Sequence, residues 1–139
     1  MSQDKELEKI RLRKMKEMMT TKQLPDNVVN ISSVDHFNEI VNDYKESITI
    51  VDFWAPWCGP CRAFAPAFES LQQEYKTNGV IFAKLNVDEL GEIAQQFQVS
   101  GIPTTLFIKN KKLVHRQVGM APKDQFAKII DSVLEKNAK

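Results

Sequence analysis

The sequence has no excess of either charge and no long apolar run. Its 139 residues include 19 basic and 18 acidic side chains, so the overall balance gives no attraction for a nucleic acid. No apolar stretch approaches the ~20 residues that span a bilayer, and residues 1–6 lack the apolar core of a secretory signal. We therefore expect a cytoplasmic protein that binds neither nucleic acid nor membrane.

Metal ligands are also scarce, because the chain holds only two cysteines and two histidines. A structural zinc site needs four ligands, and His36 and His115 do not have the spacing of a zinc finger. A chain of this length buries a sufficient core without cross-links, and a disulfide across two residues stabilises by only about 2 kcal/mol. Cys58 and Cys61 are therefore expected to serve redox chemistry, without a metal.

Residues 3–19 are predicted to form a helix that precedes the domain. They contain no Gly or Pro, and their apolar side chains fall roughly on one helical face: Leu7, Ile10, Met15, Met18 and Met19. Such a stripe is most often a packing face, but its methionines and the basic residues between positions 11 and 16 also suit a segment that binds a partner or a membrane surface. Pro25 and Asp26 mark a linker. We assign residues 1–27 to an extension and residues 28–139 to one domain.

The rest of the chain alternates between strand and helix patterns. Strands are predicted at residues 28–31, 48–54, 80–87, 104–108 and 113–118, and helices at 32–44, from near 59 to 75, at 89–97 and from 122 onward. This order predicts an α/β domain with three layers and a mixed central sheet. The turn at residues 110–112 lacks the glycine that usually follows Asn, so we expect a loose or three-residue connection.

The two cysteines lie where a strand turns into a helix. If the helix begins near Gly59, Cys58 and Cys61 share one face of its first turn and can form a disulfide. A helix amino terminus favours a thiolate there and lowers its pKa. We therefore expect Cys58 to be the nucleophile and Cys61 to be the resolving thiol that releases the reduced substrate.

Four other residues have two readings each. Asp52 interrupts an apolar strand, so it is either a buried proton carrier for Cys61 or a solvent-facing carboxylate, since strand alternation does not fix its face. Lys84 either pairs with Asp52 or lies at the surface. Trp57 is either a core aromatic or an exposed partner contact. Because only about 5–6% of bonds before proline are cis, we interpret Pro103 as a proline at an edge or at the start of a strand, not as one with a cis bond.

Several motifs together resemble the thioredoxin family. The similarity begins with Val51-Asp-Phe-Trp-Ala and Trp57-Cys-Gly-Pro-Cys, continues through Pro66, Lys84-Leu-Asn-Val-Asp, Gly101-Ile-Pro-Thr and Phe107-Ile-Lys-Asn, and ends at Val118-Gly. It covers about residues 28–136 in unbroken order. Several motifs at consistent spacing are far more specific than one Cys-x-x-Cys.

The resemblance implies a thioredoxin fold, with a five-stranded sheet flanked by four helices, in a monomer. It implies dithiol/disulfide exchange on protein disulfides, regeneration by a thioredoxin reductase, and no cofactor beyond the Cys58–Cys61 disulfide. It further implies a cis Ile102–Pro103 bond that faces the cysteines, with Asp52 assisting Cys61 and Lys84 nearby. The substrate groove would be lined by Trp57, Gly59, Pro60, Ile102, Pro103 and Gly119.

Two other functions stay open at this point. Gly-Pro between the cysteines favours a reductase, whereas oxidising or isomerising relatives usually have a histidine in that pair. Alternatively, the domain is a binding module that the amino-terminal helix directs to a partner. Met120 departs from the family pattern and extends the expected groove with an adaptable apolar side chain.

Overall fold

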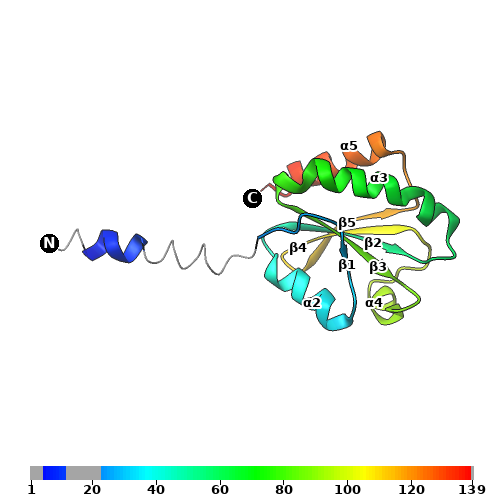
Figure 1. Ribbon diagram of the computed structural model, residues 1–139, viewed down its shortest axis with the longest axis horizontal. Helices are drawn as coiled ribbons and strands as arrows, with labels where there is room; N and C mark the ends of the chain where they lie inside the picture. Colours follow the sequence, from blue (N-terminus) through cyan, green and yellow to red (C-terminus); the bar gives the residue numbers. More distant parts are fainter. Residues whose placement is uncertain (1–4, 12–22, 139) are drawn as a thin grey trace.

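The computed structural model describes residues 5–11 and 23–138 (Figure 1). Residues 5–11 are helical. The domain's strands are β1 (Val29–Asn30), β2 (Ile48–Trp54), β3 (Val80–Asn86), β4 (Thr104–Lys109) and β5 (Lys112–Val118). Its helices are α2 (Val34–Asp43), α3 (Gly59–Tyr75), the short 3-10 helix η1 (Lys76–Asn78), α4 (Gly91–Gln96) and α5 (Lys123–Lys136).

The strands form one mixed sheet in the order β1-β3-β2-β4-β5. β2 lies at the centre, parallel to β3 and antiparallel to β4. β1 is parallel to β3, and β5 is antiparallel to β4. The first six residues of β2 are all buried, as its continuous β-branched and aromatic sequence requires. The predicted mixed five-stranded sheet is therefore confirmed.

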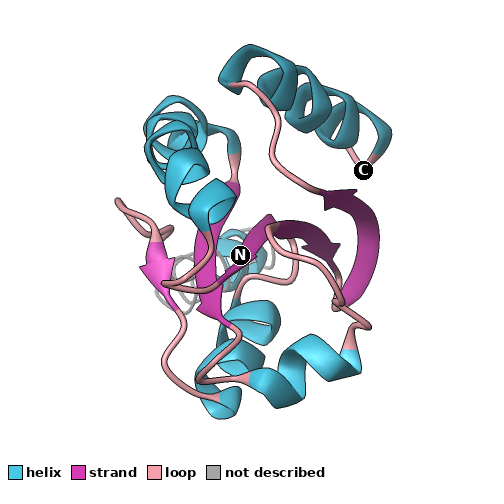
Figure 2. Ribbon diagram, turned by 90° about the vertical axis from the view of Figure 1, so that its right-hand side faces the viewer, coloured by secondary structure: helices cyan, strands magenta, loops and turns pink. Residues whose placement is uncertain are grey.

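Helices cover both faces of this sheet (Figures 1 and 2). On one face α2 and α4 pack on a cluster that includes Val51 and Phe53. On the other face α3 and α5 pack on a cluster that includes Ile50 and Phe107. Because side chains alternate along a strand, Asp52 lies on the same face as Ile50, the one covered by α3.

The described part of the extension is exposed to solvent. Every residue from 5 to 11 is exposed, and Leu7 and Ile10 have exposed fractions of 53% and 43%. The methionines predicted to continue this stripe lie outside the described residues. Within the predicted linker, Leu24 packs against the α2 side of the core, and the Tyr44 hydroxyl donates to the Gln23 carbonyl at 3.2 Å. A partner-binding role for the extension stays a prediction.

The β4–β5 hairpin differs from the expectation. Lys109 pairs with Lys112, so only Asn110 and Lys111 connect the strands. Both residues have positive φ, +53° and +64°, which is the pattern of a tight two-residue type I′ turn. The prediction of a looser or three-residue turn was therefore wrong. The strand pairing imposes left-handed backbone even on a lysine.

Candidate active site

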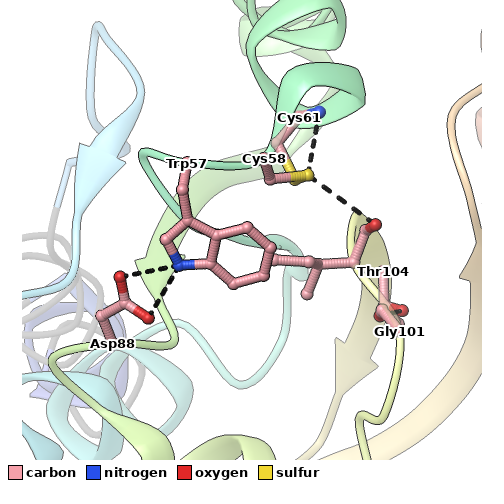
Figure 3. Close-up of a disulfide and its surroundings, with 7 residues drawn as sticks. Trp57, Cys58, Cys61, Asp88, Gly101 and Thr104 are labelled. Carbon is pink, nitrogen blue, oxygen red and sulfur yellow. Dashed lines mark hydrogen bonds between the residues drawn. A yellow bond between two sulfur atoms is a disulfide. The ribbon is translucent and has the colours of Figure 1, made fainter.

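The two cysteines are joined in a disulfide at the start of α3, with their Cα atoms 5.3 Å apart (Figure 3). Cys58 is the residue that caps the helix, and its Sγ accepts a hydrogen bond from the Cys61 backbone N–H at 3.3 Å. Both are buried, with exposed fractions of 5% for Cys58 and 1% for Cys61. A thiolate on Cys58 would take the place of a capping oxygen, where the helix dipole and free N–H groups stabilise negative charge.

The sequence around the cysteines explains this local geometry. The Cys58 N–H donates to the Ala55 carbonyl at 3.1 Å, which turns the chain sharply after β2. Gly59 and Pro60 then begin the helix and are both exposed. Proline suits the first helical turn because its missing N–H would have no partner there. The two residues that follow Cys58 are thus at the surface, whereas Cys58 itself has an exposed fraction of 5%.

A second loop, preceding β4, faces the disulfide. The Ile102–Pro103 peptide bond is cis, as the family resemblance implied. Pro103 directly precedes β4, so its predicted place at the start of a strand is also confirmed, and only the expectation of a bond that is not cis was wrong. The Ile102 carbonyl oxygen lies 3.8 Å from Cys58 Sγ, and the Pro103 carbonyl accepts from the Gly119 N–H at 2.8 Å. Thr104 steadies the loop, because its hydroxyl donates to the Gly101 carbonyl at 2.5 Å. The structure thus brings Ile102, Pro103 and Gly119 together beside Cys58.

Trp57 is an exposed aromatic beside the disulfide, not a core residue. Its exposed fraction is 69%, and its Nε1–H donates to the two carboxylate oxygens of Asp88 at 3.0 and 3.2 Å (Figure 3). Val118 and Met120, which flank Gly119, are also exposed, at 64% and 46%. Sequence reasoning assigned Asp88 no role, although it ends the quoted Lys84–Asp88 motif. Apolar side chains therefore gather on two sides of the disulfide.

Asp52 is fully buried, which excludes the solvent-facing reading. Neither of its carboxylate oxygens has a hydrogen-bond partner. Burial raises the pKa of Asp52 to about 7, against an opposing effect of the Lys84 ammonium. Lys84 pairs with Asp52 in the β2–β3 register, but its Nζ lies 4.2 Å from the centre of the Trp54 ring. A carboxyl in this state can accept or release a proton near neutral pH.

The part of the chain that the structure describes offers no metal site as an alternative. Within residues 5–11 and 23–138, no group of three or more His, Cys, Asp or Glu side chains is placed to hold a metal ion. Over the same residues, no helix combines the length and apolar character needed to cross a bilayer. The candidate active site is the disulfide together with the cis Ile102–Pro103 loop beside it and the buried Asp52.

Comparison with known proteins places this geometry in context. Residues 28–132 match the family model described as Thioredoxin. Thioredoxin from Chlorobaculum thiosulfatiphilum is 48% identical over 87 residues, covering 63% of this chain and 80% of the relative. Thioredoxin from Haemophilus influenzae is 41% identical over 104 residues, or 75% and 94% of the two chains. The X-ray structure of Fasciola hepatica thioredoxin superposes with a TM-score of 0.69 at 35% identity, covering 76% of this chain and 98% of that one.

Proposed function

This chain belongs to the thioredoxin family, and on that premise we propose that it is a general reductase of protein disulfides that works through Cys58 and Cys61. Thioredoxin relatives are disulfide oxidoreductases, and the chain carries the cysteine pair that this chemistry needs. The observation that best supports Cys58 as the nucleophile is its capping position, and the Gly-Pro pair between the cysteines supports the reductase direction because it resembles the reducing members of the family. A stabilised thiolate there makes the reduced form a good nucleophile.

In the first step the reduced Cys58 thiolate attacks one sulfur of a substrate disulfide. A bond forms between Cys58 Sγ and that sulfur, and the other substrate sulfur leaves as a thiolate. The Cys61 N–H, 3.3 Å from Cys58 Sγ in the oxidised protein, stabilises the thiolate before attack. The exposed Gly59 and Pro60 leave room for the substrate chain to approach.

In the second step Cys61 resolves the mixed disulfide. Its thiol gives its proton to the Asp52 carboxylate, and the resulting thiolate attacks Cys58 Sγ. The Cys58–Cys61 disulfide forms, and the second substrate sulfur leaves as a thiolate that takes a proton from water. Asp52 suits this role because burial raises its pKa to about 7.

Binding of the substrate is assigned to the apolar surface around the disulfide. Trp57, Gly59 and Pro60 lie on one side, and Ile102, Pro103 and Gly119 lie on the other. The substrate would lie between them as an extended segment, held by apolar contact and by backbone groups of the loop before β4.

The wider setting of the activity is part of the same proposal. A thioredoxin reductase would return the disulfide to the dithiol, and the protein would act as a cytoplasmic monomer without a further cofactor. Family membership supports disulfide-containing proteins and a reductase as partners. The nearly balanced charge gives no reason to add a nucleic acid.

The test is capture of mixed disulfides together with reduction of insulin. Cys61→Ser should trap substrates on Cys58, because the resolving thiol is missing, and Cys58→Ser should trap none. The wild-type chain should reduce insulin, and its midpoint potential should lie near the thioredoxin value of about −270 mV. A midpoint near −180 mV or higher, or equal trapping by both variants, would contradict the reductase assignment.

A further inference from the structure

One row of polar residues crosses the whole sheet beside the site. The residues paired directly across neighbouring strands in this row are Asn30, Lys84, Asp52, Thr105 and Gln117. Directly paired residues point to the same face of a sheet. This face carries Ile50 and Phe107 and is the one that α3 covers. The row therefore extends across the sheet beneath the helix that begins at the cysteines.

Two neighbours in this row have buried polar atoms without partners. Asp52 and Thr105 each have an exposed fraction of 0%. Neither carboxylate oxygen of Asp52 has a hydrogen-bond partner, and neither does Thr105 Oγ1. A buried polar group without a hydrogen bond costs about 1–3 kcal/mol, so such groups need a structural or functional explanation.

The chemistry of these two side chains is complementary. An ionised Asp52 only accepts hydrogen bonds, whereas the Thr105 hydroxyl has one hydrogen to donate. Residues paired across antiparallel strands have Cβ atoms roughly 4.5–5.5 Å apart, and rotation about the side-chain bonds brings a hydroxyl within reach of a carboxylate over that separation. Asp52 and Thr105 are such a pair.

The other groups around Asp52 do not supply a hydrogen bond to its carboxylate. From β3 the cation is Lys84, whose Nζ lies 4.2 Å from the centre of the Trp54 ring. From the start of α3 the proposed mechanism brings Cys61 to Asp52, and both cysteines are joined in the disulfide in this structure. From β4 the paired residue is Thr105 itself, which carries no charge.

We propose that the Thr105 hydroxyl donates a hydrogen bond to the ionised Asp52 carboxylate and thereby keeps Asp52 able to accept the Cys61 proton at neutral pH. Thr105 is thus a positioning residue that acts through Asp52. The hydrogen bond itself can be tested without any activity of the protein. Its effect on the rate of mixed-disulfide resolution rests on the proposed function.

The hydrogen bond is tested by titration of the oxidised full-length protein. The cysteines do not titrate in this form, so the ¹³C shift of the Asp52 carboxyl, identified by its loss in Asp52→Asn, reports one midpoint. In Thr105→Val, which removes the hydroxyl at nearly constant volume, the midpoint should rise by about one pH unit, equivalent to about 1.4 kcal/mol. Thr105→Ser should keep the wild-type midpoint. Thr49→Val, a buried threonine of β2 on the opposite face, should leave it unchanged.

The kinetic consequence is tested by the pH dependence of mixed-disulfide resolution. Burial and Lys84 without a hydrogen bond place the pKa of Asp52 at about 7, so the hydrogen bond would hold the wild-type midpoint below this value, and its loss in Thr105→Val would reduce the ionised fraction at pH 7 from nearly all of Asp52 to about one half. Resolution by Thr105→Val should therefore be about twofold slower than wild type at pH 7 and equal to it at pH 9. Thr105→Ser should follow the wild-type profile.

Three results would overturn the proposal. The hydrogen bond is refuted if Thr105→Val keeps or lowers the midpoint, or if Thr105→Ser shifts it as far as valine does. The kinetic role is refuted if the midpoint rises and the pH profile does not move. A wild-type chain that fails to reduce insulin refutes the proposed function instead, and the titration then still decides the hydrogen bond.

Discussion

Replacing the buried carboxylate of Asp52 should destabilise the protein at acidic pH and stabilise it at neutral pH and above. Burial raises the pKa of Asp52 in the folded protein from its ordinary 3.8 to about 7. Between these two values the folded protein retains a proton that the unfolded chain releases. The free energy of unfolding therefore decreases as pH rises through this window and becomes level above it.

The size of the effect follows from the same two values. Over this window the wild-type protein loses about 1.4 kcal/mol of stability for each unit of pH, or about 4 kcal/mol in all. Asp52→Asn removes this loss because the amide does not titrate. The amide has more polar sites than the Thr105 hydroxyl can satisfy, and a buried polar site left unpaired at 0% exposure costs about 1–3 kcal/mol at every pH. The stability of the Asp52→Asn variant relative to wild type should thus improve by about 4 kcal/mol between about pH 4 and pH 7.5.

Guanidinium unfolding of the oxidised proteins, followed at half-unit steps from pH 4 to pH 9, measures this difference. Asp124→Asn, at an exposed position in the first turn of α5, provides the control. Its difference in stability from wild type should not change comparably with pH. The reasoning is refuted if the stability difference between wild type and Asp52→Asn is constant between pH 4.5 and pH 6.5. Such a result would mean that Asp52 ionises in the folded protein much as it does in the unfolded chain.

Two further substitutions test the surroundings of Asp52 and the hairpin. Lys84→Met removes the ammonium that opposes the effect of burial, so the pKa of Asp52 should rise further. Mixed-disulfide resolution should then need a higher pH, which a pH–rate profile measures. An unchanged profile would contradict this prediction. Lys111→Gly removes the backbone strain of a lysine at φ +64° and should stabilise the protein by up to about 1 kcal/mol in thermal unfolding. The control Lys112→Gly lies within β5 and should destabilise the protein. A lower melting temperature for Lys111→Gly would contradict the turn assignment.

Much of the framework could be predicted because local sequence and tertiary environment agree there. The strand at residues 48–54 was predicted with its observed bounds, since a β-branched and aromatic run of that length fits a strand covered on both faces. The helix start at Gly59 follows from the Gly-Pro sequence. The predicted helix at residues 32–44 begins after Ser33, whose hydroxyl caps it by accepting from the His36 N–H at 3.0 Å.

The site could be predicted only in part, because its details depend on contacts between distant residues. In a strand buried on both faces, apolar residues occupy both sides, so alternation did not tell which way Asp52 points. The hydrogen bonds of Trp57 to Asp88 join residues 31 positions apart, and the pairing of Asp52 with Thr105 depends on the strand register. The turn at Lys111 also depends on contacts between the strands, because the pairing of β4 with β5 overrides the preference of lysine for negative φ.

The position of Lys84 shows why the buried carboxylate is compensated only in part. A close ion pair with Lys84 would favour the ionised form strongly and hold the pKa of Asp52 low, which would leave it unable to keep a proton near pH 7. With the ammonium 4.2 Å from the centre of the Trp54 ring, the charge still opposes burial but does not cancel it. A neutral donor such as Thr105 adds a smaller stabilisation of the carboxylate than a cation does. Partial compensation therefore keeps the pKa of Asp52 near neutrality, and the stability lost through its burial is the physical consequence of that balance.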